Sequence, residues 1–144
     1  MSVSKIRPIA ERKRISLNMD VAQSLPYAAI DTEKISQVLD NLLDNALKFT
    51  PEGGKVLIRA ALRDRRPSGD PEKGFIEVSV SDTGCGIPAE NIQDIFDKFK
   101  KLHAKGTGLG LYIASQIVRA HGGDIWVKSG EKTGTTFFFT VPVF

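Results

Sequence analysis

One amphipathic stretch, residues 37–51, constrains the fold of this chain more than any other segment. Apolar residues in and just before it recur three and four positions apart, as in an α-helix that buries one face. We expect Asp31 or Thr32 to cap the start of this helix, and Pro51 with Gly53 and Gly54 to end it. The predicted buried face consists of Ile35, Val38, Leu39, Leu42, Leu43 and Ala46.

A second stripe on the same helix carries Asn41, Asn45 and Lys48. At about 100° per residue, these side chains fall within about 60° of one another and about 90° or more from the centre of the apolar face. Asparagine is a poor helix former, so two of them one turn apart beside a lysine require an explanation. An amide oxygen can help hold hydrated Mg²⁺, and a lysine can hold a phosphate. From the helix alone, a ligand-binding edge and an ordinary polar surface are both open interpretations.

Composition narrows the class of protein. The 144 residues, 41% hydrophobic and 26% charged, predict one folded domain. The net charge of +3 and the lack of aromatic residues among the first basic clusters predict no nucleic-acid partner. Cys85 is the single cysteine, which fits a reducing, cytoplasmic setting. Because no apolar run approaches eighteen residues, we also expect no direct membrane insertion.

The N-terminal part is predicted to contain a helical segment and then strands. Residues 1–14 have the pattern of a helix end or linker that Pro8 limits. A strand with one buried face follows, in which Ile15, Leu17 and Met19 alternate with polar residues. A second short strand is predicted at residues 27–30.

Asp82 is the second informative residue. Two β-rich runs, 55–64 and 75–81, flank a Pro- and Gly-rich loop and predict a long hairpin. The period of two along the second strand places Asp82 on the same inward face as Val80. An interior carboxylate is costly unless it is hydrogen-bonded. Gly84 and Gly86 follow, and they permit a left-handed turn and close approach of a flat ligand. A turn in which Asp82 only caps the next helix remains an alternative.

The last third of the chain adds a glycine-rich turn at residues 106–111, which opens a helix predicted at 109–120. Free N–H groups at such a helix start form an anion site. A short helix is predicted at 88–96, and a closing hairpin at 124–128 and 135–141. Phe96 and Phe99 are predicted as hydrophobic plugs, and His121 as a helix cap.

These motifs, in this order, resemble the ATP-binding catalytic domain of sensor histidine kinases. That domain belongs to a superfamily with DNA gyrase, the mismatch-repair clamp and a large heat-shock chaperone. The matching boxes are the N box at 41–50, the first glycine box at 82–86, the phenylalanine box at 95–99 and the second glycine box at 106–111. The resemblance implies an α/β (α+β) two-layer sandwich of the Bergerat type, a mixed sheet of about five strands covered on one face by three helices. Residues 1–14 are then a connecting stub, and residues 15–144 the ATP-binding domain.

The resemblance also implies the ligands, ATP and Mg²⁺, and the residues that bind them. Asn45 is the expected Mg²⁺ ligand, while Asn41 and Lys48 approach the phosphates, and these three are the expected catalytic residues. Asp82 accepts a hydrogen bond from the adenine amino group, and Phe49 contacts the nucleotide where the family often has tyrosine. The other expected nucleotide-binding residues are Gly84, Gly86, Ile87, Lys101, Gly106, Thr107, Gly108, Leu109, Gly110 and Leu111.

Asn41 bears on the type of reaction. ATP-hydrolysing relatives carry a glutamate at the matching position, where it acts as a general base. An asparagine cannot take up a proton at neutral pH, so phosphoryl transfer to a histidine is implied instead of hydrolysis. Neither His103 nor His121 lies in the sequence context of an acceptor. The implied partners are therefore a histidine-bearing dimerisation domain of a longer kinase and, downstream, a response regulator, with the fragment itself monomeric.

The sequence departs from the family pattern at the lid over the nucleotide. Only the six residues 100–105 separate Phe99 from Gly106, which makes this lid short. Lys101 stands where a basic residue is common, but a lysine cannot form the bidentate contacts of an arginine. Two alternatives to the kinase remain: an ATP-hydrolysing conformational clamp and a non-catalytic nucleotide-binding module.

Overall fold

The computed structural model describes residues 2–21, 31–63, 74–87, 89–92, 94–97, 109–130 and 134–142. The strand predicted at 27–30, the lid at 100–105 and Phe99 lie outside these residues. Within the described part of the chain, no helix combines the length and apolar character needed to cross a membrane.

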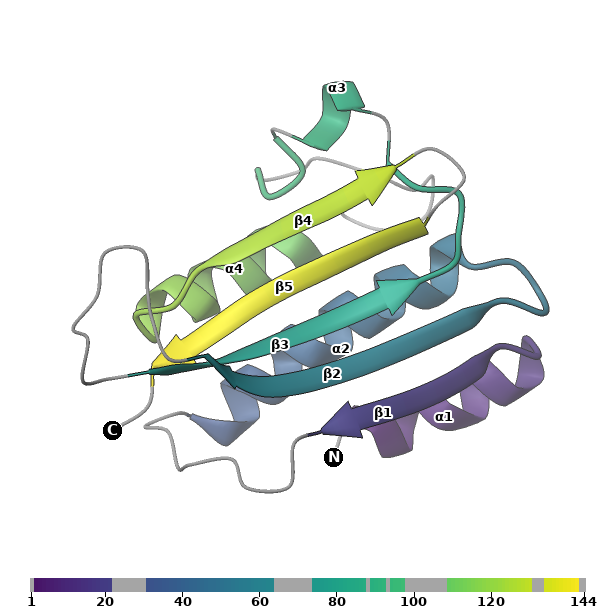
Figure 1. Ribbon diagram of the computed structural model, residues 1–144, viewed down its shortest axis with the longest axis horizontal. Helices are drawn as coiled ribbons and strands as arrows, with labels where there is room; N and C mark the ends of the chain where they lie inside the picture. Colours follow the sequence, from purple (N-terminus) through teal and green to yellow (C-terminus); the bar gives the residue numbers. More distant parts are fainter. Residues whose placement is uncertain are drawn as a thin grey trace.

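The fold is a five-stranded mixed sheet in the order β1-β2-β3-β5-β4, with helices α1, α2 and α4 behind one face (Figure 1). Strand β1 runs parallel to β2, and the other neighbouring pairs are antiparallel. This architecture confirms the predicted mixed sheet covered by helices. The elements are α1 (Ser2–Arg12), β1 (Ser16–Val21), α2 (Thr32–Phe49), β2 (Lys55–Arg63), β3 (Phe75–Asp82), α3 (Ala89–Ile92), α4 (Gly110–Ala120), β4 (Ile125–Gly130) and β5 (Gly134–Pro142).

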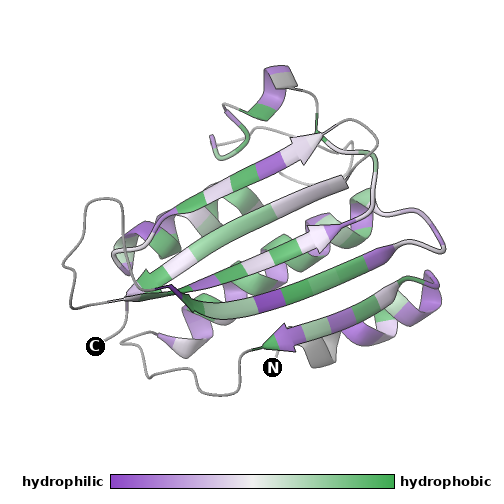
Figure 2. Cartoon of the chain, viewed as in Figure 1, coloured by the Kyte–Doolittle hydropathy of each residue, from purple (hydrophilic) through white to green (hydrophobic). Residues whose placement is uncertain are grey.

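Helix α2 occupies the centre of the helical layer, where it packs on α1, α4 and β3. Its apolar stripe is buried as predicted, apart from Leu39, which is only partly buried. Figure 2 shows hydrophobic residues along α2 and along all five strands, and the buried ones among them form the shared core. From the sheet, that core receives Val56, Ile58, Val80, Phe137, Phe139 and Val141, each no more than 4% exposed.

The two ends of α2 are fixed by its capping groups. The Asp31 side chain accepts hydrogen bonds from the N–H groups of Glu33 and Lys34, at 3.1 and 3.2 Å, which confirms the predicted N-cap. Thr50 caps the other end, donating its N–H and its hydroxyl to the Ala46 carbonyl. The helix therefore ends before Pro51, as predicted.

Two expectations about the N-terminal region are wrong. Pro8 does not limit α1, which continues through it to Arg12. The packing of α1 on α2, with Ala10 only 1% exposed, outweighs the hydrogen bond that a proline removes. In β1, Leu17 is buried as predicted, but Met19 is 42% exposed. Met19 lies on β1, which is an edge strand of the sheet and has a neighbouring strand on one side only.

The elements after β3 follow their predictions, with shorter helices and slightly longer strands. Helix α3 is one turn, and Phe96 beyond it packs edge to face on Phe137 at 6.2 Å. His121 ends α4 as the predicted cap, with Nδ1 2.8 Å from the Ile117 carbonyl oxygen. Its Nε2 accepts the Asp31 N–H at 3.0 Å, so the imidazole joins the end of α4 to the start of α2.

Candidate functional site

The polar edge of α2 is in contact with the start of α4. The Asn41 side chain donates from Nδ2 to the Gly110 carbonyl oxygen at 3.0 Å, across 69 residues of sequence. This contact brings the N box together with the last part of the second glycine box. Asn41 thus has a structural partner in this state of the protein, which explains why an asparagine is tolerated in mid-helix.

The other end of the same edge contacts the loop after β3. At Gly84, a β-carbon would lie 2.4 Å from the Phe49 carbonyl oxygen, so only a glycine lets the loop approach this closely. Asn45 lies one turn beyond Asn41 and four residues before Phe49, between the two contacts. Its side chain is half-buried and makes no hydrogen bond within the described residues. The Asn45 amide therefore has no hydrogen-bond partner among the described residues, and it lies where α2 meets the start of α4 and the loop after β3.

Asp82 is buried at the end of β3, as the period-two pattern predicts, and is only 6% exposed. Its Oδ1 accepts the Gly84 N–H at 2.9 Å. Burial raises the pKa of the Asp82 carboxyl above its ordinary value, and backbone hydrogen bonds with Gly84 and Thr135 offset part of that rise. A carboxylate has about four lone-pair positions, so two backbone bonds leave it able to accept from a ligand.

Sequence reasoning missed the contribution of β5 to this site. Thr135 is paired directly with Asp82 in the antiparallel register, and its backbone is one of the groups that stabilise the carboxylate. A β-carbon on Gly134 would lie 2.0 Å from the Asp82 carbonyl oxygen, so β5 begins in close contact with the end of β3. Figure 1 shows the ends of β3 and β4, the start of β5 and the end of α2 at one end of the sheet. In the sequence, the glycine and threonine at the start of the last strand, Gly134 and Thr135, were the signal that could have indicated this contact.

The remaining predicted residues are distributed around this junction. Lys48 is half-buried and forms an ion pair with the exposed Asp44 at 2.9 Å. Ile87 and Leu111 are 3% and 6% exposed and belong to the hydrophobic core, while Leu109 and Gly110 are half-buried at the start of α4. Gly86 has φ of 79°, the left-handed conformation that the motif predicted. Lys101, Gly106, Thr107 and Gly108 lie outside the described residues.

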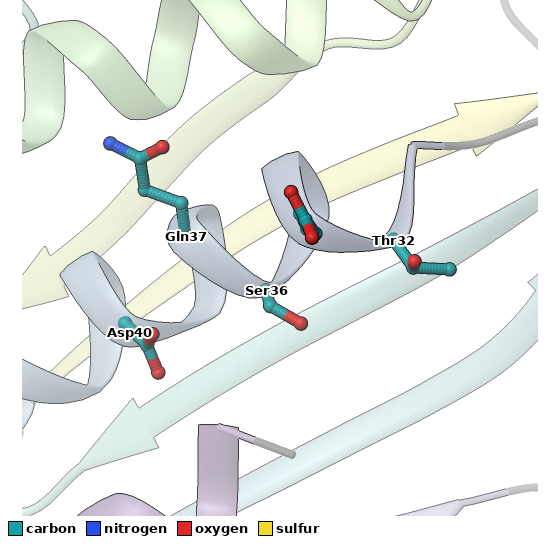
Figure 3. A pocket seen from close by; sticks show the side chains of 5 residues that line it. Thr32, Ser36, Gln37 and Asp40 are labelled. Atoms are coloured by element: carbon teal, nitrogen blue, oxygen red, sulfur yellow. The ribbon is translucent and has the colours of Figure 1, made fainter.

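A separate hollow of about 410 Å³ runs along the first half of α2. In Figure 3, Ser36 and Asp40 point to one side of the helix and Gln37 points away from them. The described lining contains none of the predicted site residues; it consists of Thr32, Glu33, Ser36, Gln37 and Asp40. Since those groups are hydrophilic and offer no apolar wall for a base, we place the candidate site at the Asn45–Asp82 junction.

The residues at this junction fit an adenine nucleotide and Mg²⁺. Asp82 offers a buried acceptor, which suits an exocyclic amino group. Mg²⁺ takes oxygen ligands and keeps several of its waters beside substrate phosphates, so it needs few protein groups, and the amide oxygen of Asn45 is of the type that it binds. No group of three or more His, Cys, Asp or Glu side chains able to hold a metal is present among the described residues.

The tight contact at Gly84 leads to a stability prediction. We expect Gly84→Ala to lower the free energy of unfolding by about 2 kcal/mol, because the new methyl group meets a backbone oxygen that cannot rotate away. Gly110→Ala is the matched control, since its β-carbon would lie 3.8 Å from Asn41, an ordinary contact. Urea unfolding of both variants measures the difference. Equal stability of the two would show that the loop at Gly84 moves aside freely.

Comparison with known proteins identifies the same family. Residues 30–144 match the model described as "Histidine kinase-, DNA gyrase B-, and HSP90-like ATPase". The chain is 44% identical over 122 residues to the sensor histidine kinase WalK of Bacillus subtilis (strain 168), covering 81% of this chain and 19% of that protein. It is 41% identical over 147 residues to the adaptive-response sensory kinase SasA of Thermosynechococcus vestitus, covering 99% of this chain and 37% of that protein. The chain thus spans well under half the length of these relatives.

Solved structures extend the similarity to the fold. The nucleotide-free catalytic domain of histidine kinase ThkA superposes with a TM-score of 0.81 at 30% identity, covering 98% of this chain and 87% of that one. Full-length ShkA in complex with AMPPNP superposes with a TM-score of 0.81 at 32% identity, covering 97% of this chain and 28% of that one. The fold therefore matches most of the ThkA catalytic domain and a smaller part of full-length ShkA.

Proposed function

Because the chain belongs to the family of histidine kinase-, DNA gyrase B- and HSP90-like ATPases, and is the ATP-binding catalytic domain of sensor histidine kinases, we propose that it transfers the γ-phosphoryl group of ATP to a histidine. The acceptor histidine belongs to a dimerisation domain outside this chain, and a response regulator receives the phosphoryl group next. The cytoplasmic location predicted from the single cysteine is part of the same proposal.

One observation carries the proposal: the N box, the first glycine box and the second glycine box meet through contacts between their own residues. Asn41 bonds to Gly110, and Phe49 touches Gly84, with Asn45 between them. In the bound state Asp82 orients the base through its amino group, while the α4 N–H groups and Lys48 face the phosphates. Mg²⁺ held by Asn45 would supply charge neutralisation on the phosphates.

Asn41 supports transfer over hydrolysis. Its amide donates to the Gly110 carbonyl oxygen and cannot remove a proton from water. An imidazole acceptor is already a nucleophile, so the domain mainly has to position the two reactants and exclude water. No carboxylate is needed beside the γ-phosphate for this reaction, whereas a hydrolysing clamp requires one.

The test supplies the chain with labelled ATP, Mg²⁺ and a separately produced helical domain that carries the acceptor histidine, and then measures two products. We expect acid-labile phosphohistidine to accumulate, with little free phosphate from the chain alone. Steady phosphate release that Asn45→Ala abolishes would identify the ATP-hydrolysing clamp instead. Tight nucleotide binding with neither product, even with a tethered acceptor, would identify a non-catalytic binding module.

A further inference from the structure

Ser129 joins the loop after Asp82 to an edge strand of the sheet. Ser129, on edge strand β4, is half-buried, and its Oγ accepts the Ile87 N–H at 2.7 Å. Ile87 is the residue at which the loop after Asp82 returns to the core, and it is only 3% exposed. A hydroxyl on one edge of the sheet thus anchors the far end of the glycine loop.

The same hydroxyl is bonded to the hairpin on its other side. Ser129 donates to the Gly134 carbonyl oxygen at 3.2 Å and lies 2.9 Å from Thr135 Oγ1. A serine hydroxyl has one proton and two lone pairs. When the Ser129 hydroxyl donates its proton to the Gly134 carbonyl oxygen, its two lone pairs accept from the Ile87 N–H and the Thr135 hydroxyl. All of its hydrogen-bonding positions are then used.

Strand register connects this network to Asp82. Thr135 is directly opposite Ser129 on β4 and directly opposite Asp82 on β3. The three side chains therefore form one row across three neighbouring strands, on the same face of the sheet. Gly86 adds a backbone contact, because a β-carbon there would lie 2.4 Å from the Gly130 carbonyl oxygen. Displacing Ser129 would loosen both neighbours of the Asp82 carboxylate, the loop and the start of β5.

We propose that Ser129 is a positioning residue of the nucleotide site, which holds the 83–87 loop and Thr135 so that Asp82 meets the amino group of adenine. This inference rests on the proposed function, since it concerns the same base pocket. Without the hydroxyl, the buried Ile87 N–H loses its acceptor and the loop relaxes away from its place beside Asp82.

The test compares the affinity of the chain for ATP with its affinity for purine riboside triphosphate, which lacks the amino group. We expect Ser129→Ala to weaken ATP binding about 10-fold and to affect the analogue less, so that the preference for ATP falls. Ser129→Thr keeps the hydroxyl and should restore the preference. Ser81→Ala is the matched control. It removes a hydroxyl that lies 2.9 Å from the Thr136 hydroxyl, and these two residues are the chain neighbours of Asp82 and Thr135, on the opposite face of the sheet.

A preference for ATP that is unchanged in Ser129→Ala, or an equal loss for both nucleotides, would overturn the positioning role. If Ser129→Ala fails to fold, Ser129→Cys replaces it in the test. Because a thiol forms weaker hydrogen bonds than a hydroxyl, the cysteine variant should prefer ATP over the analogue less than the wild type does. An unchanged preference for ATP in this variant would also overturn the positioning role. A wild-type chain that binds both nucleotides equally would overturn the proposed adenine site itself, whatever the variants do.

Discussion

Asp82→Asn is expected to weaken ATP binding about 100-fold while leaving the nucleotide-free fold nearly as stable as the wild type. The carboxylate accepts from Gly84 and still has capacity for the adenine amino group. A carboxamide has only one accepting oxygen. Its NH₂ group would face an N–H donor, either of the chain or of the base, and two donors cannot form a hydrogen bond with each other. The stability cost stays small because the carboxamide does not carry the charge that burial of Asp82 penalises.

The pH dependence of stability follows from the same group. The native state holds the Asp82 proton more tightly than the unfolded chain, because the pKa of this carboxyl is raised on folding. The stabilisation is fully present below the ordinary carboxyl pKa, and it is lost as the pH rises from there through the raised value. We expect the wild type to lose stability relative to Asp82→Asn across this window. ATP affinity should change in the opposite sense, weakening on acidification as the acceptor becomes protonated.

Calorimetric titration with ATP and urea unfolding across pH measure these two effects. Asp20→Asn is the matched control, because it makes the same change on the exposed carboxylate that pairs with Arg59 on β2. That variant should bind ATP as the wild type does. A loss of stability in Asp82→Asn with unchanged ATP affinity would show that Asp82 is only a structural cap for the loop.

Asn45→Ala is expected to reduce phosphoryl transfer about 1000-fold in the presence of Mg²⁺. The Asn45 amide lies between the Gly110 and Gly84 contacts, and it makes no hydrogen bond within the described part of the chain. ATP binding without Mg²⁺ should stay unchanged, because Asp82 and the α4 amides do not depend on Asn45. The effect should therefore appear in the transfer rate and in the Mg²⁺ dependence of binding.

Transfer rates at several Mg²⁺ concentrations, together with ATP binding in a chelator, separate these contributions. Gln37→Ala is the matched control, since it removes an exposed amide from the same helix two turns earlier. Equal losses of transfer in the two variants would point to a general effect on α2. A wild-type rate in Asn45→Ala would mean that the metal, if used, is held elsewhere.

Local patterns in the sequence were sufficient for the elements that carry the site. The three-and-four spacing identified α2, its cap and its polar edge, and the period of two placed Asp82 inside the sheet. These features depend on residues within a few positions of one another, where helix and strand geometry decide the outcome. Pro8 shows the limit of local rules, because packing of α1 on α2 overrode a helix breaker.

Long-range contacts could not be predicted in the same way. The bond from Asn41 to Gly110 joins positions 69 residues apart, and the row Asp82–Thr135–Ser129 depends on the register of three strands. Register is set by the packing of the whole sheet, so no single segment encodes it. A glycine at position 84 was predicted because it would admit a ligand. The structure shows a second reason for a glycine there, which is the close contact with the backbone of Phe49.

A crystal structure of the chain with a non-hydrolysable ATP analogue and Mg²⁺ tests the central claim most directly. We predict that the adenine amino group lies within hydrogen-bonding distance of Asp82, that the Asn45 amide oxygen binds the metal, and that the phosphates face the start of α4. A nucleotide bound instead in the hollow lined by Ser36 and Asp40, with Asp82 contacting only Gly84 and Thr135, would contradict the account.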